Sequence, residues 1–368
     1  MLPSSLVALL LRVMPLVSFF DSGGLAMRPK LKVLTLILGF SVFSYAAPKE
    51  LVGKRSDRSG MAASAGSAVL WKDPSDIASR DLFYGPGGKT HQPSGAFTFV
   101  KEDLEASSPK FVVRDADGVE WKVKLGGEAR SETAATRIVW AVGYFTDEDY
   151  LLRTLRVANM PLRLHRGQSL VAADGSMTNA RLERHRKGID KAGIWKWRSD
   201  SVWGTRELDG LRVMMALINN WDLKDVNNAV YSIGSGEKTK QVYVVSDLGA
   251  SFGSPGFSWP MRKSRGNLES YSRSTFISKV TPEHVDFSAP GRPALIRAVA
   301  ASDFVRRLRM RSIGKRISRE HAKWIGEILG RLSQDQIRSA FRGAGYSPLE
   351  VEGFAKVVET RIAQLNEL

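Results

Sequence analysis

The sequence contains no cysteine in its 368 residues. This excludes disulfide bonds and thiolate metal sites, and it fits an oxidising compartment without establishing one. There is no G-x-S-x-G element, which argues against a serine hydrolase. The histidines are scattered and show no ligand spacing, so the sequence predicts no zinc site. They stand at positions 91, 165, 185, 284 and 321.

No single hydrophobic run reaches the roughly 20 residues that a membrane-spanning helix needs. From Met27 the chain has a short basic stretch, an apolar segment at 33–43 and small residues at 44–46. This layout is typical of a secretory signal peptide. It predicts translation from Met27, a periplasmic or secreted location, and a targeting segment within residues 1–46. A second interpretation joins the apolar runs, including the one in residues 1–26, into a membrane anchor at the N-terminus.

Acidic residues are the scarcer charge, since 38 Asp and Glu stand against 54 Lys and Arg, for a formal net charge of +16. Such an excess favours polyanionic ligands such as nucleic acid, anionic lipid or phosphorylated molecules. The basic residues are scattered, however. Their two local clusters, at 181–191 and 306–316, lack interleaved aromatics and any nucleic-acid-binding signature. We therefore expect most of them on solvated helix faces and do not expect nucleic-acid binding as the main function.

Residues 47–75 are rich in Ser, Ala, Gly, Lys and Arg, which predicts a flexible linker. Three short runs with β character then predict strands. These runs are residues 96–100, 110–115 and 119–125. Asp117 and Gly118 between the last two give a hairpin signal, and after Gly127 the apolar period changes to that of a helix. Residues 76–157 are thus predicted to form a β-rich part that contains one helix.

Residues 158–368 are predicted to be mainly helical. Residues 205–220 place their apolar side chains on one helical stripe, and a hairpin with a Gly-containing turn begins near Ala229. Two capping boxes open further helices near the C-terminus. They are Ser333 with Gln336 and Ser347 with Glu350. The chain is therefore predicted to be α+β, with a β-rich lobe and a helical lobe that contains one β-hairpin.

The stretch WDLKDVNN at 221–228 places a carboxylate and an amide in one short loop between the helix and the hairpin. Phosphoryl transfer needs a carboxylate that accepts or orients the attacking hydroxyl, and oxygen ligands that hold magnesium on the phosphates. Asp222 suits the first role and Asn227 the second, although the adjacent Asn228 could replace Asn227. Asp247 ends the second strand of the hairpin, which directs it to the same place, and a carboxylate is a ligand that Mg²⁺ prefers.

These motifs resemble those of the protein-kinase-like superfamily, whose protein kinases carry D-L-K-x-x-N and D-F-G. The stretch DLKDVNN resembles the first, and DLG at 247–249 resembles the second with leucine for phenylalanine. Gly249 would allow a sharp turn. The stretch SSPKFVVRDADGVEWKVKLG at 107–126 is similar to the atypical branches, the phosphoinositide kinases and HipA-like kinases. The resemblance covers about residues 96–253 and implies a bilobed protein-kinase-like fold.

The same resemblance implies roles for four upstream residues. Lys124 would reach the phosphates of ATP, Glu132 would be its ion-pair partner, and Ser107 and Ser108 would cover the phosphates together with backbone amides. The residues themselves agree for Lys124, since a lysine on a strand among apolar neighbours can clamp a phosphate. Glu128 and Glu132 share one helix face, so either could pair with it. We prefer Glu132, which is deeper in the helix.

Three features depart from the family pattern. The separation between Lys124 and Glu132 is shorter than in protein kinases, so the helix must follow its strand almost directly. No G-x-G-x-x-G covers the phosphates, and the Gly-rich YGPGGK at 84–89 lies too far upstream, where we expect a structural turn. The histidine of many such catalytic loops is also missing.

The sequence therefore predicts a Mg²⁺- and ATP-dependent phosphotransferase that acts on an unidentified hydroxyl of a protein, a sugar or a lipid head group. An alternative is a kinase-shaped binding module that no longer transfers phosphate. The predicted export favours it, because compartments outside the bacterial cytoplasm hold little ATP. A third hypothesis is a basic exported protein that binds polyanions. In that case Asp222 and Asn227 would only satisfy a turn by side-chain hydrogen bonds.

Overall fold

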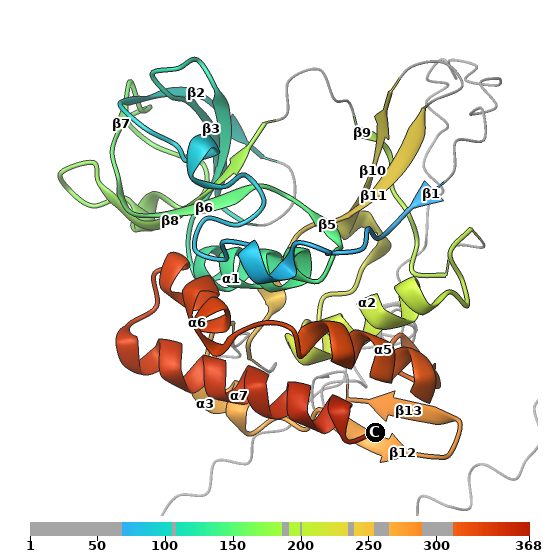
Figure 1. Cartoon of the computed structure of the whole chain (residues 1–368). Coiled ribbons are helices and arrows are strands. Elements are labelled where there is room, and N and C mark those ends of the chain that lie inside the picture. The colour runs from blue at the N-terminus through green and yellow to red at the C-terminus, as the bar shows by residue number, and fades with distance from the viewer. Residues whose placement is uncertain are drawn as a thin grey trace, which may run out of the picture. The chain divides into compact units, whose positions relative to one another are not determined.

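The computed structural model describes residues 68–104, 108–185, 191–198, 201–234, 239–253, 265–288 and 312–368. The predicted targeting segment, most of the predicted linker and most of the 306–316 cluster lie outside these ranges. The described residues form a mixed α+β structure with several sheets and helices (Figure 1). In this part of the chain, no helix has both the length and the apolar character required to cross a bilayer.

The largest sheet has six strands in the order β6-β8-β4-β3-β2-β7. They are β2 (Phe97–Asp103), β3 (Lys110–Arg114), β4 (Glu120–Lys124), β6 (Asp149–Leu155), β7 (Val157–Ala158) and β8 (Met177–Arg184). Only Arg156 separates β6 from β7, yet these strands lie at opposite edges, so the sheet curls strongly. One of its faces packs Phe111, Trp121 and Leu182 into a separate hydrophobic cluster. Because side chains alternate along a strand, Lys124 lies on the other face.

The three predicted strands are confirmed as β2, β3 and β4, but β8 was not predicted. It carries the sheet beyond residue 157, so the expected boundary between the two parts falls inside the sheet. The sequence of β8 includes Arg181 and Glu183, and charged side chains argue locally against a central strand. Arg181 pairs with Glu183 two residues away, but its closest carboxylate is that of Asp149 on β6, a contact that is distant in the sequence.

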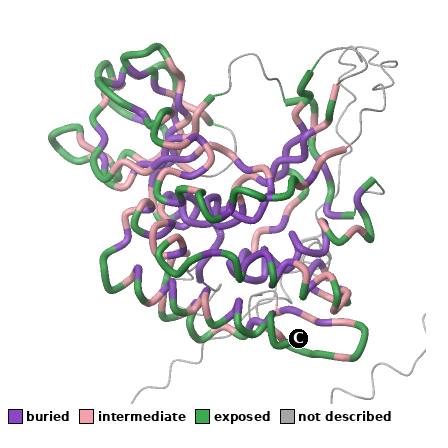
Figure 2. The backbone as a smooth tube through the Cα atoms, viewed as in Figure 1, coloured by how far each residue is buried: buried purple, intermediate pink, exposed green. Residues whose placement is uncertain are grey.

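Helix α1 (Glu128–Ala141) lies beneath this sheet and above α6 (Gln334–Gly343) (Figure 1). Most of its side chains are small or short, which lets strands and helices approach from several directions. As a result α1 is buried almost all round, as Figure 2 shows by its purple trace. The helix predicted after Gly127 is confirmed, and it occupies the centre of the described structure.

A second sheet has the order β1-β11-β10-β9, with β5 also paired to β11. Its strands are β1 (Ala68–Val69), β5 (Phe145–Thr146), β9 (Lys191–Gly193), β10 (Asn228–Ile233) and β11 (Lys240–Val245). β10 and β11 form the predicted antiparallel hairpin. The prediction that residues 47–75 are a linker is wrong at its end, because β1 pairs in parallel with β11.

The remaining elements are mainly helical, as predicted, but they include a small sheet, whereas only the β10–β11 hairpin was predicted for the helical part. They are α2 (Arg206–Leu217), α3 (Leu268–Ser272), α5 (Arg319–Leu329), α6 and α7 (Pro348–Asn366), with a small sheet of β12 (Ile277–Val280), β13 (His284–Phe287) and β14 (Ile317–Ser318). Both predicted capping boxes are formed, at the N-termini of α6 and α7. In Figure 1, α3, α6 and α7 lie on the side of α1 away from the six-stranded sheet.

Candidate functional site

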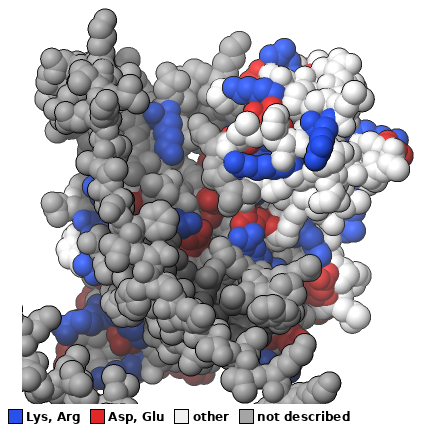
Figure 3. All heavy atoms as spheres, turned by 180° about the vertical axis from the view of Figure 1, so that it is seen from behind, with Lys and Arg blue, Asp and Glu red and all other residues white. Residues whose placement is uncertain are grey.

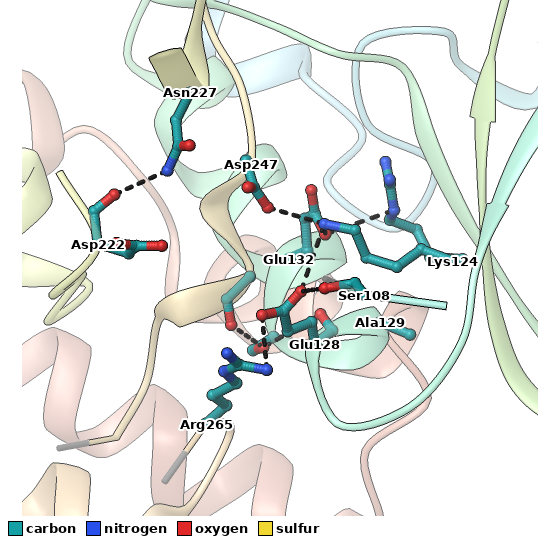
Figure 4. A network of polar contacts seen from close by, with 12 residues as sticks. Ser108, Lys124, Glu128, Ala129, Glu132, Asp222, Asn227, Asp247 and Arg265 are labelled. Carbon is teal, nitrogen blue, oxygen red and sulfur yellow. Dashed lines mark hydrogen bonds and ion pairs between the residues drawn. The ribbon is translucent and has the colours of Figure 1, made fainter. Parts of the chain in front are cut away.

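Lys124 is the last residue of β4 and its ammonium group contacts three carboxylates (Figure 4). Its Nζ lies 2.6 Å from Glu132 Oε2, 2.8 Å from Asp247 Oδ1 and 3.5 Å from Glu128 Oε2. The lysine side chain is only 2% exposed, whereas that of Asp247 is 41% exposed. The structure thus brings together three residues that the sequence predicted for one site, Lys124, Glu132 and Asp247.

The short separation between Lys124 and Glu132 follows from the way α1 begins. β4 ends at Lys124, Gly126 turns the chain with a φ of 91°, and α1 starts at Glu128. Glu128 and Glu132 then lie one helical turn apart on the same face. Glu132 is the closer partner of Lys124, as preferred from the sequence, and Glu128 is a second and longer contact.

In this cluster, burial and neighbouring charges act in opposite directions on the pKa values of Lys124, Glu132 and Asp247. Burial alone would lower the pKa of Lys124, but the carboxylates, Glu132 first, outweigh it and raise that pKa. Burial raises the pKa of Glu132 to about 7, against the opposing effect of its cationic neighbours Arg181 and Lys124. Burial would also raise the pKa of Asp247, but the Lys124 ammonium holds it below its usual range.

Arg181 extends the cluster and was missed from the sequence. It lies on β8 directly opposite Lys124, and only 1% of its side chain is exposed. Its guanidinium is 2.6 Å from Asp149, 2.9 Å from Glu183 and 3.5 Å from Glu132. The expectation that the 181–191 cluster lies on a solvated helix face is therefore wrong for Arg181, because partners from other strands stabilise its buried charge.

Several further basic residues also lie on strands rather than on helices. Lys101, Lys110, Arg114 and Lys122 belong to β2, β3 and β4. On the side of the molecule turned away in Figure 1, Lys and Arg side chains gather over the six-stranded sheet (Figure 3). A hollow of about 440 Å³ opens beside these strands, with Lys101, Val112, Lys122 and His185 among its lining residues.

Asp247 follows β11 in a left-handed backbone conformation with a φ of 53°. Asp and Asn tolerate this region better than other non-glycine residues. Two residues later, a Cβ atom on Gly249 would lie 2.8 Å from Glu128 Cβ, and the Gly249 carbonyl accepts a hydrogen bond from Ser131 Oγ at 2.7 Å. The glycine was expected to permit a sharp turn. The structure shows instead that it permits a close approach to α1.

The loop between α2 and β10 fixes Asp222 and Asn227 relative to each other. Asn227 Nδ2 donates to the backbone carbonyl of Asp222 at 2.8 Å, and Lys224 Nζ lies 2.7 Å from Asp222 Oδ2. The role of Lys224 was not predicted. Asn228, considered as a substitute for Asn227, is buried and donates to the Trp195 carbonyl at 3.2 Å, so it has a structural contact of its own.

The serine segment before β3 contacts α1. Ser108 Oγ donates to Glu128 Oε2 at 2.9 Å, while Ser107 lies outside the described residues. The Gly-rich segment at 84–89 packs on the six-stranded sheet, where the Tyr150 hydroxyl donates to the Gly88 carbonyl at 2.8 Å. This contact fits the structural turn expected there.

Asp247 and Asn227 offer oxygen atoms of the kind that bind Mg²⁺. Because Asn227 donates its amide NH₂ to Asp222, its carbonyl oxygen is turned away from that contact, on the side of Asp247 (Figure 4). The described residues contain no group of three acidic, His or Cys side chains that could hold a metal ion. Mg²⁺ often takes only one or two protein ligands and completes its shell with phosphates and water, so Asp247 and Asn227 fit such a site.

Comparisons with known proteins find distant structural likenesses and no sequence match. No protein-family model matches the chain, and no curated protein sequence matches it significantly. Among solved structures, the Helicobacter pylori proinflammatory kinase CtkA aligns with a TM-score of 0.38 at 11% identity, over 75% of this chain and 98% of that chain. The Golgi casein kinase aligns with a TM-score of 0.29 at 11% identity, over 75% of both chains.

Proposed function

We propose that the protein is a Mg²⁺- and ATP-dependent phosphotransferase. The observation that carries this proposal is the contact of Lys124 with both Glu132 and Asp247, at 2.6 and 2.8 Å. A buried lysine held by a helix carboxylate, beside a half-exposed carboxylate, is the arrangement needed to place phosphates against a metal ion. The three residues come from β4, α1 and the turn after β11.

We further propose a bilobed arrangement of the protein-kinase-like kind. One lobe would comprise the six-stranded sheet and α1, and the other would comprise the β10–β11 hairpin with the later helices. The face of the sheet that carries Lys124 would form the roof of the nucleotide site. The hollow beside Lys122 has a volume in the range of ligand pockets, roughly 300–1,000 Å³, and we assign it to the nucleoside part of ATP.

In the proposed reaction, the acceptor hydroxyl oxygen attacks the γ-phosphorus of ATP. The new O–P bond forms as the bond from the γ-phosphorus to the β,γ-bridging oxygen breaks. ADP leaves with that electron pair, and the hydroxyl proton passes to the carboxylate of Asp222. Lys224 Nζ lies 2.7 Å from Asp222 Oδ2, so this ion pair would orient the carboxylate before attack. Lys124 would hold phosphate oxygens, and Glu132 would keep its ammonium group in place.

Bound Mg²⁺ would neutralise charge on the phosphates, and Asp247 with Asn227 would hold it. Asp247 Oδ1 accepts a hydrogen bond from Lys124, so the carboxylate that would hold the metal also pairs with the lysine that would hold the phosphates. The acceptor is proposed only as a hydroxyl-bearing protein, sugar or lipid head group. We also propose that residues 27–46 direct the protein out of the cytoplasm, which N-terminal sequencing of the mature protein would test.

The test is Mg-ATP binding by calorimetry, followed by transfer from γ-³²P-ATP to water, to the protein itself and to sugar, peptide and lipid acceptors. We expect Asp247→Ala to abolish Mg²⁺-dependent binding. We expect Asp222→Asn to retain binding while transfer falls by about 10²–10⁴-fold. Binding without transfer to any acceptor would show a binding module instead, and absence of nucleotide binding by the wild type would overturn the proposal.

A further inference from the structure

Arg265 brings a further cationic group to the site from the C-terminal part of the chain. Its Nη1 lies 2.6 Å from Glu128 Oε1, and its guanidinium lies 5.6 Å from the ring centre of Trp221, next to Asp222. The side chain is 26% exposed. Figure 4 shows it directed at Glu128, between the loop that carries Asp222 and the segment that carries Ser108.

Glu128 therefore collects donors from three separate parts of the chain. One carboxylate oxygen accepts from Arg265, while the other accepts from Ser108 Oγ at 2.9 Å and lies 3.5 Å from Lys124 Nζ. A hydroxyl, an ammonium and a guanidinium group are the donors that proteins use to bind phosphate oxygens. The Glu128 carboxylate is thus surrounded by side-chain groups of the kinds that bind phosphate.

Arg265 has donor capacity left over after this contact. A guanidinium carries five N–H donors, and the Nε of Arg265 is buried with no hydrogen-bond partner among the described residues. The guanidinium therefore keeps N–H donors beyond its contact with Glu128, and a phosphate oxygen is an acceptor that suits them. The ion pair with Glu128 meanwhile fixes the arginine at the edge of the site.

We propose that Arg265 donates hydrogen bonds to the phosphoryl group in transfer, and that Glu128 positions it there. This inference rests on the proposed function, and it adds a residue that neither the motifs nor the resemblance indicated. As the bond to the β,γ-bridging oxygen breaks, negative charge is spread over the oxygens of the transferring group and the leaving ADP. A fixed guanidinium stabilises that charge more than it stabilises the ground state.

The test compares Arg265→Ala, Arg265→Lys and Glu128→Gln in the full chain. Arg273→Ala is the matched control, because it removes an equal charge from an exposed arginine in the same segment. We expect Arg265→Ala to lower turnover by about 10²-fold, the size of the loss of one preorganised donor. The Kd of Mg-ATP should change by less than about threefold. Arg265→Lys should recover part of the turnover, and Glu128→Gln should lower it about tenfold, less than additively with Arg265→Ala.

A second measurement does not depend on the acceptor. Mg-ADP with aluminium fluoride mimics the transferring group, so Arg265→Ala should weaken its binding by at least tenfold while leaving Mg-ADP unchanged. Wild-type behaviour of Arg265→Ala in both assays would overturn the inference and leave the proposed function intact. Equal losses in Arg265→Ala and Arg273→Ala would also overturn it, in favour of a general charge effect. A wild-type protein that binds no nucleotide would overturn both proposals.

Discussion

At the scale of single residues, the main feature is a buried lysine neutralised by carboxylates from separate elements. Such a group costs desolvation energy that a well-packed apolar residue would not. A lysine buried at this cost therefore fits a role in binding better than a role in stability. The burial of Arg181 beside it makes the same point, since both cations lie on adjacent strands of one sheet face.

Breaking the central ion pair should destabilise the protein more than replacing it. We expect Lys124→Met to lower the free energy of unfolding by about 3 kcal/mol or more, because it leaves Glu132 buried without its closest cation. The double variant Lys124→Met with Glu132→Leu should recover much of this loss. Urea denaturation measures both, and equal stability of the single and double variants would contradict the expectation.

The pH dependence of nucleotide binding should follow Glu132. Its pKa is raised from 4.5 to about 7, so in this interval the folded state holds a proton that the unfolded state has released. The contribution of Glu132 to stability therefore falls as pH rises from about 4.5 to 7. The ionised form needed to hold Lys124 increases over the same range. Mg-ATP affinity should thus rise with pH up to about 7.

The assignment of this pH dependence to Glu132 can be checked by replacing Arg181. The charged groups that act on Glu132 are Lys124, Arg181, Asp247 and Asp149, and Arg181 is the strongest cationic influence. Arg181→Met should move the midpoint of the pH profile upward. Arg156→Met, which removes an exposed arginine from the same sheet region, should leave the midpoint unchanged. Calorimetric titrations between pH 5 and pH 8 would report the shift, and coincident profiles would count against it.

The residues of the site were partly predictable. The pairing of Lys124 with Glu132 followed from the resemblance to the protein-kinase-like superfamily, while the residues themselves left Glu128 as an alternative, and Asp247 was added from its position at the end of a strand. Arg181 and Arg265 could not be found this way. Their partners come from β6 and α1, and no local pattern in the sequence links a basic residue to a carboxylate that far away.

At the scale of elements, the contact between α1 and the turn after β11 sets the geometry of the site. It depends on the absence of a side chain at Gly249, where a Cβ would lie 2.8 Å from Glu128 Cβ. We expect Gly249→Ala to cost about 1–3 kcal/mol through overpacking and to weaken Mg-ATP binding by moving Asp247. Gly127→Ala is the control, because nothing lies within 4 Å of its added Cβ and its φ is −65°. Thermal melting of the two variants should differ clearly.

The capping boxes show which elements the sequence predicts well. Ser347 Oγ accepts from the Glu350 backbone N–H, and the Glu350 carboxylate accepts from the Ser347 backbone N–H. All of these partners are local, so the motif could be identified without the fold. Ser347→Ala should lower the free energy of unfolding by about 1 kcal/mol, and Ser347→Asp should restore most of it. A loss near zero in chemical denaturation would mean that packing alone determines where α7 begins.

At the scale of the whole molecule, residues 62–368 form one compact unit by themselves. Their core is built largely from α1, α2 and the C-terminal helices, with the apolar side chains of α7 among its buried members. We therefore expect removal of residues 1–61 to leave the thermal melting midpoint within about 2 °C of that of the full chain. A shift of 5 °C or more would show that the removed segment contributes to the fold.

The parallel pairing of β1 with β11 has a consequence for how the protein is made. Ala68 pairs with Gln241, so the strand that leads to Asp247 acquires one of its neighbours from the beginning of the described chain. On a ribosome, Gln241 is added 173 residues after Ala68, so this pairing must wait for most of synthesis, and contacts so distant in sequence form slowly. Synthesis would thus be well advanced before the turn that carries Asp247 could be held in its final position, so the ammonium group of Lys124 would gain this partner late.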